Sequence, residues 1–175
     1  MKKAIIIIAV ISLTTAIVFT ILYSINKNVL FLSLTLTFFT TAYHFWMRLI
    51  VGYTFNILMK NKADYTKNWY QIHNWEEKLY NILKVKKWKK YMPTFSPDLF
   101  DIKKHSLDEI AQAMCQSELV HETIIVLSFL PIILSIWFGD LPIFLITSII
   151  GALIDLSFVI LQRYNRPRII KLIKK

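Results

Sequence analysis

Glycine and cysteine are scarce in this sequence of 175 residues, which contains three glycines and a single cysteine, Cys115. Three scattered glycines cannot build a glycine-rich phosphate loop or a dinucleotide-binding fingerprint. One cysteine cannot form a disulfide within the chain. The sequence also lacks a His and Cys cluster with the spacing of a zinc site. We therefore expect no metal and no bound cofactor.

Acidic residues are few as well, because 11 Asp and Glu stand against 21 Lys and Arg and leave a net charge of +10. In a soluble protein this balance would suggest nucleic acid as a partner. Here 55 % of the residues are hydrophobic, above the roughly 45–50 % of soluble domains. Lys and Arg gather in cytoplasmic loops of membrane proteins and meet anionic headgroups. The basic excess therefore indicates membrane lipids rather than nucleic acid.

The first half of the chain holds two long apolar runs. Residues 4–23 are uncharged, and about 20 residues suffice to cross the hydrocarbon core. A signal peptide is the alternative, but the run exceeds the usual apolar core of about 7–15 residues and no clean cleavage site follows it. Residues 29–50 form the second predicted span, which continues as an interfacial segment to residue 59.

The second half holds two further apolar runs, residues 119–138 with Pro131 inside and residues 141–161. Only Gly139 and Asp140 separate them, so we expect an antiparallel helical hairpin. The fold class predicted from the four runs is an all-α polytopic membrane protein. We treat residues 1–175 as one membrane domain.

Charge predicts the orientation of the spans. Residues 60–118 carry eleven Lys against eight acids, and the tail at residues 162–175 carries three Arg and three Lys. Four spans with both termini inside place every basic segment on the cytoplasmic side of the cell membrane. An N-out arrangement, or three spans after cleavage, fits the charges less simply.

The basic segment 60–118 contains a predicted amphipathic helix over residues 68–85, where Trp75, Leu79, Ile82 and Leu83 recur at helical spacing. Trp88 follows among five lysines, and basic residues interleaved with aromatic ones suit an anionic bilayer surface. These lysines are Lys84, Lys86, Lys87, Lys89 and Lys90.

A second helix is expected to begin later in the same segment. Ser106 and Glu109 have the spacing of a capping box. We expect the helix that they start to run without a break into the third span.

Glu118 and His121 stand at the mouth of the third span and share one face of a helix, since they are three residues apart. A carboxylate beside an imidazole holds one tautomer, and such a pair can act as a general base toward a hydroxyl group. We name His121 as the candidate base and Glu118 as its orienting partner. The alternative is a polar helix end at the headgroups.

His44 and Arg48 lie deeper, in the second span, one helical turn apart. Ionisable groups within a span usually face the bundle interior and have partners, and we name both as candidate substrate-binding residues. Arg48 can alternatively snorkel to the interface. Asp155 in the fourth span is the candidate for pairing by opposite charge.

The tail concentrates arginine, since three of the four arginines of the chain are Arg163, Arg166 and Arg168. We expect a compact element interrupted by Pro167 that binds an anion, because guanidinium groups bind phosphate or carboxylate through two parallel hydrogen bonds. The alternative is a positive-inside anchor, for which lysine would serve equally well.

The tail sequence from Gln162 to Ile169, Gln-Arg-Tyr-Asn-Arg-Pro-Arg-Ile, resembles the family of glycosyl-4,4'-diaponeurosporenoate acyltransferases. These are small bacterial membrane proteins of carotenoid pigment (staphyloxanthin) biosynthesis. Three weaker stretches support the resemblance, which covers roughly residues 70–170. They are Lys86–Lys89, Asp108–Ile110, and Glu118–His121 leading into Leu130–Ile133.

The resemblance implies an integral-membrane acyltransferase that moves a fatty acyl group to a sugar hydroxyl of a membrane glycolipid, with an acyl thioester as candidate donor. The anionic donor would then be held by Arg163, Arg166, Arg168 and Asn165, and Trp88 with Lys86 would seat the loop on the bilayer. A non-enzymatic lipid-binding scaffold and, more weakly, a transporter through His44, Arg48 and Asp155 are the alternatives. A homo-oligomer is compatible with either role, since four helices enclose little volume for a long lipid.

Overall fold

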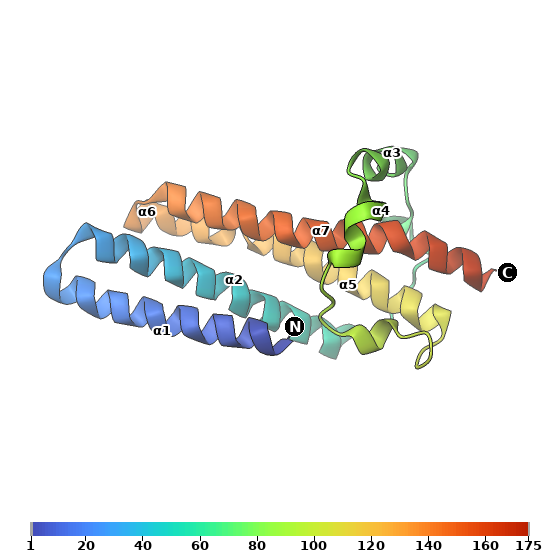
Figure 1. Cartoon of the computed structure of the whole chain (residues 1–175), viewed down its shortest axis with the longest axis horizontal. Helices are drawn as coiled ribbons and strands as arrows, with labels where there is room; N and C mark the ends of the chain where they lie inside the picture. The colour runs from blue at the N-terminus through green and yellow to red at the C-terminus, as the bar shows by residue number, and fades with distance from the viewer. Residues whose placement is uncertain (1, 175) are drawn as a thin grey trace. The chain divides into compact units, whose positions relative to one another are not determined.

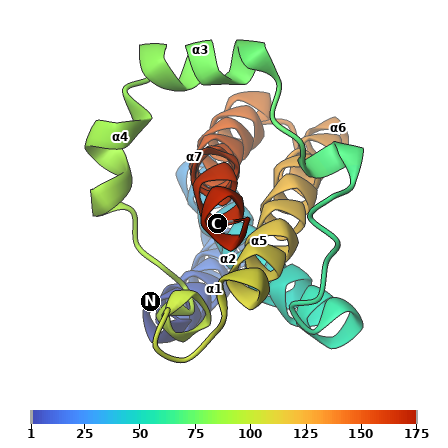
Figure 2. The same cartoon turned by 90° about the vertical axis from the view of Figure 1, so that its right-hand side faces the viewer.

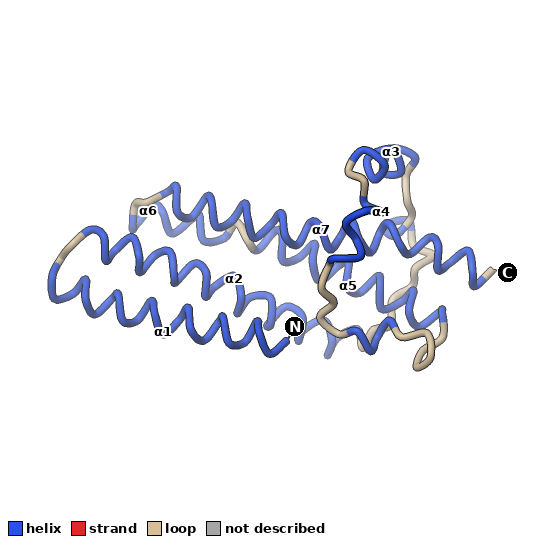
Figure 3. Tube along the Cα trace, in the orientation of Figure 1, coloured by secondary structure: helices blue, strands red, loops and turns tan. Residues whose placement is uncertain are grey.

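The computed structural model describes residues 2–174, which form helices and loops with no strand in that range (Figure 3). Among these residues, four helical stretches are long and apolar enough to cross a membrane, which confirms the predicted fold class. They are Lys2–Asn26 (α1), Val29–Met59 (α2), Leu107–Phe138 (α5 to α6) and Leu141–Ile173 (α7). The described residues divide into two compact units.

The first unit, called the span unit, comprises Lys2–Val51 and Ile124–Ile154. In it α1 and α2 run antiparallel (Figure 1). The turn between them places Lys27 in the left-handed region at φ 51°, and Asn28 Oδ1 accepts the Leu30 N–H at 2.9 Å, which caps the start of α2. Phe19 of α1 stacks against Phe38 of α2 at a centroid distance of 5.8 Å. Aromatic packing therefore joins the two helices.

A second hairpin of the span unit forms at Gly139 and Asp140, as predicted, with φ angles of 70° and 50°. It joins α6 (Ser135–Phe138) to α7. Ser33 of α2 donates to the Asp140 carboxylate at 3.1 Å. This hydrogen bond ties the turn to α2.

The second unit, called the loop unit, comprises Gly52–Thr123 and the described residues from Asp155 onward. Its α5 (Leu107–Leu127) begins at the predicted capping box, since the Ser106 N–H donates to Glu109 Oε2 at 2.9 Å and the Glu109 N–H donates to Ser106 Oγ at 3.2 Å. The short helices of this unit are η1 (Asn68–Tyr70), α3 (Asn74–Ile82), α4 (Val85–Trp88), η2 (Lys89–Tyr91) and η3 (Pro97–Phe100). Figure 2 shows α3 and α4 beside the C-terminal part of α7.

The helix predicted over residues 68–85 is divided in the structure. A left-handed Lys84, at φ 51°, separates α3 from α4, and the chain before Asn74 is not α-helical. The buried face of α3 carries Glu76 and Tyr80, whereas Trp75 and Ile82 are exposed. Polar contacts to α7, rather than the apolar stripe, therefore hold α3 against its unit.

The prediction that Pro167 interrupts the tail is wrong, because α7 continues through Pro167 to Ile173. A proline within a helix removes the hydrogen bond that its N–H would donate four residues back, here to the Arg163 carbonyl. Arg163 and Arg166 lie three residues apart on this helix, and their side chains bind Glu76 of α3 and Glu118 of α5 within the loop unit. We infer that these contacts stabilise the helical tail and offset the loss of the backbone hydrogen bond at Pro167.

Candidate functional site

Glu118 and Arg166 form a fully buried ion pair between α5 and α7, with relative exposures of 0 % for both residues. Arg166 Nη1 donates to Glu118 Oε2, and Arg166 Nη2 donates to the Tyr70 carbonyl. Arg163 Nη1 donates to the other carboxylate oxygen, Glu118 Oε1, at 2.5 Å. Both oxygens of Glu118 are therefore bound by guanidinium groups of the tail.

Arg163 extends this network to α3 and to the residues just before it. Its Nε and Nη2 bind the two oxygens of Glu76 at 2.7 and 2.8 Å, a two-point arrangement that fits the planar guanidinium. It also donates to the carbonyls of Trp69 at 3.0 Å and Gln71 at 2.9 Å. We call Glu76, Glu118, Arg163 and Arg166 the arginine clamp, because they join α3, α5 and α7.

Glu76 is buried, and burial alone would raise its pKa. Hydrogen bonds from Arg163, from the Tyr80 hydroxyl at 2.5 Å and from the His73 N–H at 3.2 Å outweigh burial and lower the pKa from 4.5 to about 2. Burial and the bond to Glu76 raise the pKa of Tyr80, so that its hydroxyl remains a donor. The clamp therefore requires an ionised Glu76.

Acid should loosen the loop unit. Because the folded-state pKa of Glu76 lies below its ordinary value, its contribution to stability is fully present above about pH 4.5 and is lost as the pH falls toward about 2. We expect protease cleavage between η1 and α3 to accelerate from about pH 5 to pH 3 in the detergent-solubilised protein. Glu76→Gln should be cleaved rapidly at both pH values, and Glu77→Gln should behave like the wild type. A cleavage rate that is equally slow at both pH values in the wild type would contradict the role of Glu76.

His121 of α5 pairs with Asp155 of α7, since His121 Nδ1 lies 2.8 Å from Asp155 Oδ1. Asp155 is 1 % exposed and the His121 side chain is 21 % exposed. Phe158, one turn after Asp155, stacks on the imidazole with a centroid distance of 4.7 Å and an interplanar angle of 10°. The carboxylate and the aromatic ring together fix the position of the imidazole.

The carboxylate beside His121 is thus Asp155, whereas the sequence predicted Glu118. The prediction relied on helical spacing, but Glu118 is engaged by Arg163 and Arg166. The signal that pointed to Asp155 was its charge inside an apolar span, which requires a partner. A sequence pattern cannot identify that partner when the two residues are 34 positions apart.

Asn165, another candidate residue of the tail, meets a lysine of η2. Lys89 Nζ donates to Asn165 Oδ1 at 2.8 Å and lies 5.1 Å from the centre of the Tyr164 ring. The Arg168 guanidinium lies 3.7 Å from the centre of the same ring. Trp88, expected at the bilayer, donates its indole N–H to the Leu83 carbonyl at 3.0 Å.

Lys86, Lys89 and Arg168 form what we call the cationic cluster. Burial lowers the pKa of Lys89, and the positive charges of Arg168 and Lys86 lower it further. Within residues 2–174 no ion pair joins these three side chains to a carboxylate, in contrast to Arg163 and Arg166. The charges of these three side chains are therefore not neutralised by a carboxylate of the described residues, and the charges of Lys86 and Arg168 act on Lys89.

His44 and Arg48 lie in the span unit against Gly151 of α7. Arg48 donates to the His44 carbonyl at 2.7 Å and to the Gly151 carbonyl at 3.0 Å. A Cβ atom at position 151 would lie 3.1 Å from His44 Nδ1, so glycine permits this close approach. The two residues are together in the structure, but they belong to a different unit from His121.

A protein-family model described as glycosyl-4,4'-diaponeurosporenoate acyltransferase matches residues 66–175. No curated protein and no solved structure matches the chain. The matched region contains His121, Asp155, the arginine clamp and the cationic cluster. It covers more than half of the chain, and the family is one of acyltransferases in carotenoid biosynthesis, which confirms the expectation of an enzyme. The chain therefore belongs to the glycosyl-4,4'-diaponeurosporenoate acyltransferase family.

Proposed function

We propose that this membrane acyltransferase moves a fatty acyl group from a thioester donor to a sugar hydroxyl of a membrane glycolipid, with His121 as the general base. The observation that supports it is the pair of His121 and Asp155 at 2.8 Å. A carboxylate accepts hydrogen bonds, so Nδ1 carries the proton toward Asp155 and Nε2 is the nitrogen left to receive one. This is the arrangement by which an Asp orients a His in hydroxyl activation.

In the proposed reaction the acceptor hydroxyl gives its proton to His121 Nε2 as its oxygen attacks the acyl carbonyl carbon. A carbon–oxygen bond forms and the carbon–sulfur bond of the donor breaks. The departing sulfur takes the proton from the imidazolium, so His121 returns to its starting state. Asp155 stabilises the imidazolium that exists after His121 has taken the proton from the hydroxyl and before it gives that proton to the sulfur.

The arginine clamp has a positioning role in this proposal. Arg163 and Arg166 are held by Glu76 and Glu118, so their guanidinium groups fix α5 against α7. Glu118 lies one helical turn before His121, and Asp155 lies two turns before Arg163. The clamp thereby sets the separation of the two helices that carry the catalytic pair.

The cationic cluster is the proposed site for the anionic part of the donor. A phosphate group near Lys86, Lys89 and Arg168 would neutralise charges that now repel one another. Arg168 and Asn165 thus keep the substrate-binding role expected from the sequence, and Lys89 is added to it.

Removing charge from the cluster should weaken donor binding. Lys89→Gln with Arg168→Gln is expected to raise the KM for a phosphate-bearing acyl thioester by roughly tenfold or more, since a charged hydrogen bond contributes about 1.5–3 kcal/mol. The KM for a short thioester without phosphate should stay unchanged. Lys103→Gln, an exposed lysine outside the cluster, is the control. Equal KM values for the phosphate-bearing donor in both variants would contradict the site.

We further propose that both termini and the loop unit face the cytoplasm at the cell membrane. Lys-rich and Arg-rich segments favour that side. The exposed Trp75 and Ile82 of α3, beside the lysines of α4, suit contact with the anionic inner leaflet.

The experiment that tests the proposed function uses the purified protein in liposomes with a radiolabelled acyl thioester and a glycolipid acceptor. We expect the label on a sugar oxygen of the acceptor. Release of labelled free fatty acid alone, at the rate seen without protein, would exclude the transfer.

A further inference from the structure

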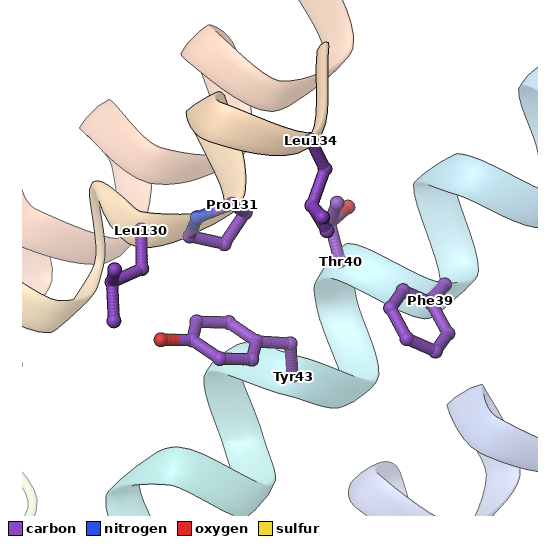
Figure 4. A pocket seen from close by; sticks show the side chains of 6 residues that line it. All are labelled: Phe39, Thr40, Tyr43, Leu130, Pro131 and Leu134. Carbon is purple, nitrogen blue, oxygen red and sulfur yellow. The ribbon is translucent and has the colours of Figure 1, made fainter. Parts of the chain in front are cut away.

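An apolar pocket of about 190 Å³ lies within the span unit, between α2 and the segment after α5. Its lining comprises Phe39, Thr40 and Tyr43 of α2 and Leu130, Pro131 and Leu134, and Figure 4 shows Tyr43 and Thr40 turned toward the last three. All six residues belong to helical stretches that are long and apolar enough to cross a membrane. The surroundings of this pocket are therefore hydrocarbon rather than water.

Pro131 explains why the pocket exists. A proline has no N–H and cannot donate to the carbonyl four residues earlier, which is that of Leu127. The α-helix accordingly ends at Leu127, and Leu130–Leu134 (η4) is a tighter 3-10 helix. The Tyr43 hydroxyl donates to the Leu127 carbonyl at 2.9 Å in place of the missing N–H. The break is thus satisfied by a side chain of α2, and the helical surface is indented beside it.

The polar atoms of the lining are already engaged. The Tyr43 hydroxyl is bound to Leu127, and Thr40 Oγ1 donates to the Thr37 carbonyl at 3.0 Å. A sugar or a charged headgroup in the pocket would have to give up its own hydrogen bonds, at a cost of several kcal/mol. A hydrocarbon chain has none to lose. An apolar cavity of about 150 Å³ in another protein binds benzene, so the volume here accommodates part of a chain.

We propose that this pocket binds part of the fatty acyl chain that the enzyme transfers. The inference rests on the proposed function for the identity of the occupant, because the fatty acyl chain is the hydrocarbon that the reaction must hold. Phe39 and Tyr43 supply aromatic surface and Leu130 and Leu134 supply aliphatic surface for that chain. The chain length that the enzyme prefers then depends on the volume left beside Pro131.

The test is photo-crosslinking of the full-length protein in liposomes to a fatty acyl thioester with a diazirine on its chain. We expect crosslinked peptides to contain Leu130 or Leu134, and excess unlabelled acyl thioester to compete while excess phospholipid does not. Leu134→Trp, which fills the pocket, should reduce the crosslink several-fold. Ile133→Trp is the matched control, because Ile133 is 50 % exposed and does not line the pocket.

Leu130→Phe is a second and milder variant, which should also reduce the crosslink. It serves as the test if Leu134→Trp does not fold. An unchanged crosslink in the folded variants, or equal competition by phospholipid, would overturn the proposal and assign the pocket to bulk lipid. The crosslink does not require turnover, so His121→Ala should retain it. A retained crosslink without any acyl transfer by the wild type would refute the proposed function and leave the pocket as a fatty acyl site.

Discussion

Replacing His121 with alanine is expected to lower kcat for acyl transfer by about 10²–10⁴-fold, the usual contribution of a positioned general base. Removal of the imidazole leaves the Glu118 network intact, but it also takes a partner from the buried Asp155. His121→Gln, whose amide can still donate to Asp155, therefore accompanies it and should lose the same turnover. The measurement is turnover of purified protein in liposomes, normalised to the amount of folded protein. His105→Ala, which removes a histidine elsewhere in the loop unit, should retain wild-type turnover.

Asp155→Asn gives a sharper test of the pairing. The substitution keeps the shape of the side chain but removes the charge that stabilises the imidazolium and selects the tautomer. In serine proteases the same change lowers kcat by about 10⁴-fold. We expect a fall of at least about 100-fold in kcat with little change in KM, because only the transition state gains from the charge. Wild-type turnover in folded His121→Ala or Asp155→Asn protein would contradict general-base catalysis by His121.

Breaking the arginine clamp is expected to have the largest effect on stability. Arg166→Met leaves the buried Glu118 with one of its two guanidinium partners, and loss of one member of a buried ion pair costs about 3–5 kcal/mol. For a chain of this length that corresponds to a fall in Tm of about 10 °C. Arg166→Lys should not restore the wild-type Tm, because an ammonium group cannot donate to Glu118 and to the Tyr70 carbonyl in the geometry of the guanidinium.

The double variant Arg166→Met with Glu118→Leu tests whether the loss of stability comes from leaving a buried charge without its partner. It removes both buried charges together, and Arg163 keeps its two-point contact with Glu76. Replacing a buried pair by apolar residues of similar volume is often neutral, so Tm should recover most of the loss. Arg168→Met, on the exposed side of the tail, should leave Tm near that of the wild type. The experiment is thermal unfolding in detergent followed by size-exclusion chromatography, and equal Tm values for Arg166→Met and Arg168→Met would contradict the clamp.

The four membrane-spanning stretches could be predicted because each corresponds to a contiguous run of apolar residues, a feature of the local sequence alone. The hairpin at Gly139 and Asp140 was predictable for the same reason. Pro167 was misread, because whether a helix tolerates an internal proline depends on what its side chains contact. Those contacts join Arg163 to Glu76, 87 positions earlier.

In the candidate site, too, contacts between residues far apart in the sequence could not be predicted. His121 and the arginines could be selected as chemically capable residues, but their partners could not. Helical spacing favoured Glu118 for His121, while the structure pairs His121 with Asp155 and gives Glu118 to two arginines. The sequence likewise cannot distinguish a guanidinium that is neutralised internally from one that is not. That distinction moves the proposed anion site from Arg163 and Arg166 to Lys86, Lys89 and Arg168.

Lipid mass spectrometry of membranes from cells that contain or lack this chain tests the proposed acyl transfer most directly. The account predicts that a glycolipid loses one fatty acyl mass when the chain is absent, that its unacylated precursor accumulates, and that wild-type protein restores the product while His121→Ala does not. An unchanged lipid composition in cells shown to produce the wild-type protein would contradict the account.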